Sequence, residues 1–164
     1  MPKGGKSEEE RIVGRTMAIA EEFFGTAQDP RQIPINLESY KKLVALWRGA
    51  FSYELDEAGE PVSWIVVVPT QRKLAGEFMA GMITEKQLFE RTETAEKYDA
   101  LYLCSAFTVP DQRGKRLAHN LMCKAIEQAP LLPNPLLFAW PTTMQGEKMV
   151  KSMEGTIGRP IARR

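Results

Sequence analysis

The sequence predicts an α/β (α+β) fold, a single domain over residues 1–164 with a mixed, mostly antiparallel central sheet flanked by helices. Its 164 residues, 43% of them apolar, are enough to bury one core. Residues 51–56 and 62–68 both have strand patterns and are joined by a short turn. Helical and extended segments follow in the order ααββ(α)βαβα, which indicates a sheet covered by helices.

Two helices are expected before the first strand. Ser7 and Glu10 have the spacing of a capping box, and apolar residues then recur at helical spacing, at Val13, Met17, Ala20 and Phe24. The segment 28–34 contains two prolines and ends this helix. Asn36 can cap the second helix, and Gly49 is expected to end it.

An antiparallel hairpin comes next. Residues 51–56 alternate between apolar and polar side chains, as in a strand with one face in water. Residues 57–61 include a glycine and a proline and form the turn. Residues 62–68 are almost entirely apolar and rich in valine, which is typical of a central strand buried on both faces.

Shorter elements are expected in two further regions. Within residues 72–98, Thr84 can cap a helix that continues to about Arg91. Near the C-terminus, residues 136–140 form a short buried strand between two prolines. Residues 145–154 then form the last helix, which the following glycine is expected to end.

The longest apolar strand is expected over residues 100–109, where Pro110 stops it. A helix follows over about residues 114–128, until Pro130. Its buried stripe is formed by small and apolar side chains: Ala118, Leu121, Met122, Ala125 and Ala129. The sequence therefore predicts a strand, a short loop and an amphipathic helix in direct succession.

Composition excludes several classes of protein. With 22 basic and 21 acidic residues, the net charge of +1 does not favour nucleic acid or an anionic membrane as the main partner. The two cysteines have no metal-ligand spacing, so we expect neither a metal site nor a disulfide framework. The N-terminus resembles neither a secretory signal nor a transit peptide, and no apolar run reaches 18 residues. We therefore expect a cytoplasmic protein.

The loop before the 114–128 helix carries the chemistry. A helix that starts after a loop presents free backbone N–H groups at the positive end of its dipole, which is how proteins hold a pyrophosphate. Arg113, Lys115 and Arg116 add positive charge at this place. Gly114 allows backbone torsions, or a close approach, that a side chain would forbid.

The six residues from Arg113 to Ala118 resemble the signature Arg/Gln-x-x-Gly-x-Gly/Ala of the GNAT superfamily of acyl-CoA-dependent N-acetyltransferases. The first and last positions agree, whereas Arg116 occupies the position of the central glycine. The flanking residues 107–110 and 121–122 are also similar to that family. The element order matches along the chain, and the close resemblance covers residues 101–126.

The resemblance implies a GNAT-like fold and the transfer of an acetyl or other acyl group from acetyl-CoA to a primary amine by direct transfer, without a metal. The acceptor would be a small-molecule or peptide amine, and a homodimer is compatible with this class. In the family, the fourth and fifth strands splay apart, and the fourth pairs with the pantetheine arm. Carried over, the cofactor-binding residues are Ala106, Phe107, Thr108, Val109, Arg113, Gly114, Lys115, Arg116, Leu117 and Ala118.

Catalytic groups are harder to assign. The family often uses a carboxylate as base and a tyrosine of the last helix as acid, but the 145–154 helix has no tyrosine. Glu54 and Tyr102 are the candidates, although Glu54 also fits a solvated strand face and Tyr102 a packed core. Cys104 has no base nearby in sequence and is expected to act as a small apolar residue. His119 is expected on the surface or on the phosphate side.

Two other readings stay open. Arg116 at the glycine position and the missing tyrosine also fit a non-catalytic module that binds acyl-CoA as a sensor or interaction surface. A third reading is an α/β interaction protein whose basic loop is merely solvated. If the chain is an enzyme, proximity and polarisation supply most of the rate, so a weakly defined base is compatible with catalysis.

Overall fold

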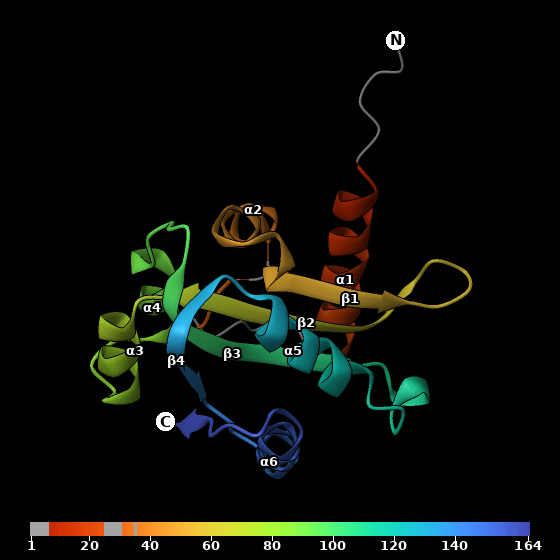
Figure 1. Cartoon of the computed structure of the whole chain (residues 1–164). Coiled ribbons are helices and arrows are strands. Elements are labelled where there is room, and N and C mark those ends of the chain that lie inside the picture. Colours follow the sequence, from red (N-terminus) through yellow and green to blue (C-terminus); the bar gives the residue numbers. More distant parts are fainter. Residues whose placement is uncertain (1–6, 25–30, 35) are drawn as a thin grey trace.

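The computed structural model describes residues 7–24, 31–34 and 36–164, and within them one sheet has the strand order β1-β2-β3-β4-β5 (Figure 1). The strands are β1 (Phe51–Leu55), β2 (Pro61–Thr70), β3 (Tyr98–Thr108), β4 (Leu131–Ala139) and β5 (Ala162–Arg163). The β1–β2 and β2–β3 pairings are antiparallel, and the β3–β4 and β4–β5 pairings are parallel. The sheet is therefore mixed, as predicted, and its longest pairing, β2–β3, is antiparallel.

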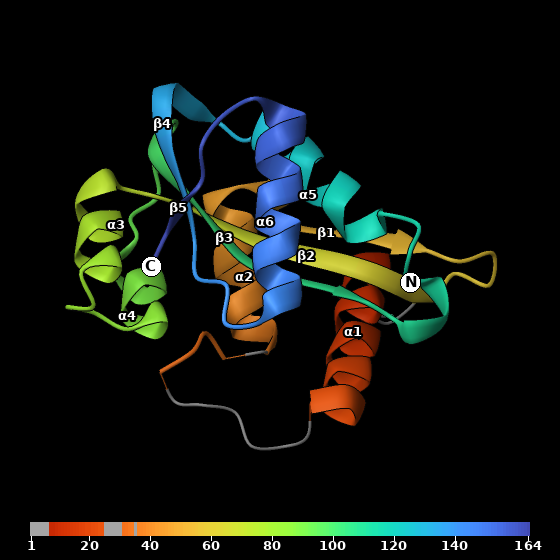
Figure 2. The same cartoon turned by 90° about the horizontal axis from the view of Figure 1, so that it is seen from below.

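Helices cover both faces of the sheet. They are α1 (Glu8–Phe24), α2 (Leu37–Leu46), α3 (Arg72–Met79), α4 (Glu85–Arg91), α5 (Leu117–Gln128) and α6 (Met144–Ile157). Figures 1 and 2 show α1 and α2 on one face, α5 and α6 on the other, and α3 and α4 beside one end of the sheet. No helix in the described part of the chain is long and apolar enough to cross a membrane.

Three predicted helix starts are confirmed. The side chains of Ser7, Asn36 and Thr84 each accept the backbone N–H three residues further on, at 3.2, 2.8 and 3.1 Å. Gln87 returns a bond to the Thr84 N–H and completes a capping box. The predicted break at 28–34 lies partly outside the described residues.

Several boundaries differ from the prediction. Helix α2 ends at Leu46, before Gly49, and a short 3-10 turn, Arg48–Ala50, follows it. Helix α6 continues through Gly155 and ends at Gly158, whose φ of 67° is the left-handed conformation of a helix C-cap. Strand β4 starts at Leu131 rather than 136, and neither α3 nor β5 was predicted.

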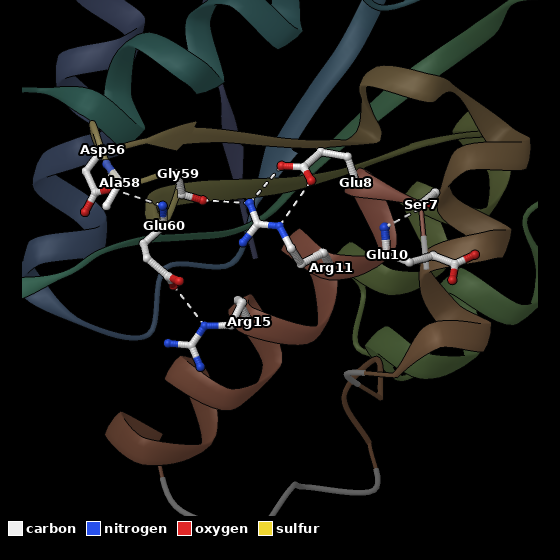
Figure 3. A network of polar contacts seen from close by, with 9 residues as sticks. All are labelled: Ser7, Glu8, Glu10, Arg11, Arg15, Asp56, Ala58, Gly59 and Glu60. Carbon is white, nitrogen blue, oxygen red and sulfur yellow. Dashed lines mark hydrogen bonds and ion pairs between the residues drawn. The ribbon is translucent and has the colours of Figure 1, made fainter. Parts of the chain in front are cut away.

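The N-terminal helix is fastened to the β1–β2 turn by the polar network of Figure 3. The Arg11 guanidinium donates to the Gly59 carbonyl at 2.8 Å, and Arg15 donates to Glu60 at 2.8 Å. Asp56 accepts the N–H groups of Ala58 and Glu60, so its carboxylate shapes the turn. Because these side chains are largely exposed, each contact contributes little to stability.

Helix α6 is bound to the C-terminal strand β5 by ion pairs. Arg163 binds Glu154 at 2.7 Å and Glu147 at 3.1 Å, both on α6. Glu154 also accepts the Ile161 N–H at 2.8 Å. The hydrogen bond from Arg163, followed by that from Ile161, lowers the pKa of Glu154 to about 2. Glu154 is therefore ionised at neutral pH, and the pair fixes α6 beside the sheet.

Candidate functional site

Strands β3 and β4 diverge in the middle of the sheet, after Leu103 and Ala139, and we call this point of divergence the fork. They pair in parallel as far as Leu103 and Ala139, after which the chain that follows β4 turns toward α6. Strand β3 continues along β2 to Thr108. Among the described residues, positions 104–108 of β3 thus have a partner strand on the β2 side only.

A β-bulge lies at this fork. Ser105 is opposite Val66 and Leu103 is opposite Val67, so Cys104 is the extra residue of β3. A bulge locally bends a strand and redirects the side chain that it carries. Cys104 is therefore placed where β3 and β4 diverge.

A groove of about 540 Å³ opens from the fork. One wall is residues 103–108 of β3, and a second is Ala118 and Met122 of α5. The remaining wall combines the segment 139–143 with α6, whose apolar lining residues are Met149, Val150 and Met153. The groove thus joins the β3 edge to the start of α5.

The N-terminus of α5 has no side-chain cap. Arg116 is the N-cap residue, and the first intrahelical bond is from the Asn120 N–H to the Arg116 carbonyl, at 2.9 Å. The N–H groups of residues 117–119 therefore have no acceptor within the helix. Because Ala118 also lines the groove, this positive helix end is available to an anion there.

The three cations of the motif point in different directions. Arg113 lines the groove, and its Nε donates to the Thr108 carbonyl at 3.0 Å. Lys115 donates to Gln112 at 2.7 Å. The Arg116 guanidinium reaches His119 Nε2 at 2.9 Å and the Ser152 hydroxyl of α6 at 3.1 Å.

Five of the ten predicted cofactor-binding residues line the groove: Ala106, Phe107, Thr108, Arg113 and Ala118. The other five do not belong to the groove lining: Val109, Gly114, Lys115, Arg116 and Leu117. The Val109 N–H is taken by the Val62 carbonyl of β2 at 2.9 Å. Contacts of these five with a cofactor stay a prediction.

Backbone torsions explain why α5 begins at Leu117 rather than near residue 114. Gly114 has a φ of 87° and Arg116 a φ of 58°, both left-handed, so the chain cannot be helical before residue 117. A Cβ at Gly114 would meet no atom within 4 Å, which shows that its torsion, not space, requires glycine. Arg116 adopts the same conformation without being glycine, and Gly is the residue expected there.

We expect Arg116→Gly to be about 1 kcal/mol more stable than Arg116→Ala, because both remove the same side-chain contacts and only glycine adopts φ of 58° without cost. Thermal or urea unfolding of the two variants measures the difference. Equal stabilities would show that the left-handed conformation is not kept in solution. Because both variants lack the arginine side chain, the comparison does not depend on how much that side chain contributes to stability.

The two predicted catalytic residues do not meet in this site. Glu54 is exposed on β1, opposite Ser63, and is not part of the groove lining. Tyr102 is 1% exposed, packs against Phe78 and Phe138, and likewise does not line the groove. Burial raises the pKa of Tyr102, so its hydroxyl remains protonated.

Glu85, which the sequence reading missed, lies beneath the fork. This residue begins α4, is 9% exposed, and accepts a hydrogen bond from the Tyr102 hydroxyl at 2.7 Å. The Cys104 thiol donates to the same oxygen at 3.2 Å, and the Ile33 N–H donates to the other oxygen at 3.3 Å. In sequence, Glu85 has only the appearance of an acid that stabilises a helix N-terminus.

The groove can hold an elongated ligand with an anionic end. Its lining, within the described residues, contains Arg113 but no aspartate, glutamate, histidine or tyrosine. No group of described His, Cys, Asp and Glu residues could hold a metal ion.

No family model, curated protein or solved structure matches the chain. Function is therefore inferred from the groove and its chemistry.

Proposed function

We propose that this chain is an acyl-CoA-dependent N-acyltransferase of the GNAT type, which moves an acetyl or other acyl group directly to a primary amine of a small molecule or peptide. The observation that carries the proposal is the fork. Strand β3 leaves β4 after Leu103 and borders a groove that reaches the uncapped N-terminus of α5. We assign each of three parts of acyl-CoA to one region of this groove: the diphosphate, the extended pantetheine arm and the thioester.

The diphosphate binds at the start of α5. The N–H groups of residues 117–119 and the guanidinium of Arg113 supply hydrogen bonds and positive charge without a large net charge on the protein. From there the pantetheine arm runs along residues 104–108 and pairs with β3 as an added strand would. The thioester then lies at the fork, next to Cys104.

Positioning supplies most of the rate. Holding the thioester and the amine in contact makes the reaction effectively unimolecular, which is worth as much as about 7–11 kcal/mol. A backbone N–H group at the fork would stabilise the charge on the thioester oxygen. Glu85 is a buried carboxylate in hydrogen-bond contact with Cys104, which lines the groove.

Acetyl-CoA is expected to raise the melting temperature of the purified chain. At ten times the dissociation constant, the ligand stabilises the folded state by about 1.4 kcal/mol. Arg113→Glu should reduce the shift. Arg159→Glu is the matched control, since Arg159 lines a different cavity, near residues 126–135. No shift at millimolar acetyl-CoA would contradict the proposal, and thiol release over a panel of amines tests transfer itself.

A second function is a non-catalytic acyl-CoA-binding module. It is favoured by the groove lining, which offers no acid or base among the described residues, and by the burial of Tyr102. This function predicts the same shift in melting temperature with no release of CoA thiol to any amine. Release with even one amine would favour the transferase.

A further inference from the structure

A thiol and a carboxylate meet at the fork of the groove. Cys104 lines the groove, is half-buried and is the bulge residue of β3. Its Sγ donates a hydrogen bond to Glu85 Oε1 at 3.2 Å. The residue that carries the thiol therefore borders the space proposed for the thioester, and the thiol has a proton acceptor in hydrogen-bond contact.

Glu85 is itself held in place from two sides. The Tyr102 hydroxyl donates to Oε1 at 2.7 Å, and the Ile33 N–H donates to Oε2 at 3.3 Å. A nucleophile within hydrogen-bond reach of a base that a third group orients is the arrangement of covalent catalysis. Cys104, Glu85 and Tyr102 fill these three positions.

We propose that Cys104 is a reversible S-acylation site, loaded from acyl-CoA bound in the groove while Glu85 accepts the proton of the thiol. The inference rests on the acyl-CoA binding of the proposed function. It does not depend on transfer to an amine, and it applies equally to the non-catalytic module. When an amine is bound, the acyl group goes directly to it. Without an amine, Cys104 is the nucleophile beside the thioester.

The reaction is an exchange of thioesters. A bond forms between Cys104 Sγ and the acyl carbonyl carbon, and the bond between that carbon and the CoA sulfur breaks. The thiol proton passes to Glu85 and then to the CoA sulfur, which leaves as a free thiol. Nothing is oxidised or reduced, and the reverse reaction with CoA restores Cys104.

The Cys104 thiol needs Glu85 as a base in order to react. Burial, and then the negative charge of Glu85, raise the pKa of the Cys104 thiol, so the resting group is a protonated thiol rather than a thiolate. A protonated thiol is a poor nucleophile toward general alkylating agents. It reacts when a bound thioester is held against it and the proton moves to Glu85 during the attack.

The product is a stored acyl group. One thioester replaces another, so neither direction has a large driving force. The acylated fraction of Cys104 then follows the ratio of acyl-CoA to free CoA. A chain with this property reports the acylation state of the CoA pool.

Cys123 is a matched internal control. It is also half-buried, and burial raises the pKa of its thiol. It lies on α5, is not part of the groove lining, and its Sγ is 4.0 Å from His119 Nε2. Non-specific acylation would label both cysteines, whereas acylation from the groove labels Cys104.

The test incubates the purified chain with acetyl-CoA, without an amine, and measures intact mass followed by peptide mapping. We expect one acetyl group on Cys104, removed by hydroxylamine or by excess CoA. Cys104→Ala should abolish the label and Cys123→Ala should leave it. Glu85→Gln should slow loading about 100-fold, the usual contribution of a general base. Peptide mapping of the wild-type chain still tests the inference if Glu85→Gln fails to fold.

The outcomes separate the inference from the proposed function. A melting-temperature shift with acetyl-CoA but no label, or equal labelling of both cysteines, overturns the inference and leaves the proposed function standing. No shift and no label overturns both. An unchanged loading rate in folded Glu85→Gln overturns the role of the carboxylate.

Discussion

Phe138→Ala is expected to lower the free energy of unfolding by about 3–5 kcal/mol, the usual cost of removing a fully buried aromatic ring. Phe138 is 0% exposed and stacks on Tyr102 with ring centroids 5.1 Å apart. It pairs with Tyr102 in the parallel β3–β4 ladder, just before the fork. The cavity would open where the two strands must stay joined for the groove to exist. Urea unfolding measures the loss.

Leu132→Ala is the control in the same strand. Leu132 is 44% exposed, so its truncation should change the free energy of unfolding by about 0.5 kcal/mol or less. Comparable losses in the two variants would mean that β4 does not bury Phe138 as described. The difference between the variants is expected to exceed 2 kcal/mol.

Ala118→Glu is expected to weaken the binding of acetyl-CoA by at least about tenfold, or 1.4 kcal/mol. Ala118 lies in the first turn of α5 and lines the groove. A carboxylate there would compete with the diphosphate for the free N–H groups and would repel its charge. Two charges about 4 Å apart near a surface interact by about 4 kcal/mol, which solvent reduces.

The same substitution has two opposing effects on stability, because Ala118 is partly buried against the core and a larger side chain must be accommodated there. A negative charge at a helix N-terminus contributes about 0.3–1 kcal/mol of stability. Ala118→Gln has nearly the same size without the charge, so its acetyl-CoA affinity isolates the electrostatic part. Equal affinities for the Glu and Gln variants, by calorimetry at low salt, would remove the diphosphate from the start of α5.

Local signals made much of the fold predictable. Ser7, Asn36 and Thr84 were found because capping depends on residues three positions apart. Helix α3 was missed because it is short and, within it, only Ala75 and Phe78 are buried, too few to produce a helical stripe. Strand β5 spans two residues, pairs with β4 and is tied to α6 by the ion pairs of Arg163, and a strand pattern in the sequence cannot reveal any of these.

The candidate site was predictable only where it follows one stretch of chain. The end of β3 and the start of α5 are contiguous, so residues 106–108, Arg113 and Ala118 could be proposed from the motif. Glu85 is 19 residues from Cys104, and the two meet only because the tertiary structure brings the first residue of α4 to β3. The wall formed by α6 depends in the same way on tertiary structure.

The structure also describes how Arg116 is accommodated at the position where the GNAT signature has its central glycine. Arg116 takes the left-handed conformation that glycine favours, and its guanidinium spans from α5 to Ser152 of α6. The side chain is thus not part of the groove lining. The backbone at the helix start can still face an anion, because residues 117–119 follow it in helical conformation.

Backbone hydrogen exchange, with and without acetyl-CoA, tests most directly that the groove beside β3 is the ligand site. Slower exchange is predicted at residues 104–108 and 117–119, whose N–H groups would include those that pair with the pantetheine arm and the diphosphate. No change is predicted at the separate cavity near residues 126–135. Protection confined to that second cavity, or its absence from both β3 and the start of α5 despite binding, would contradict the assignment.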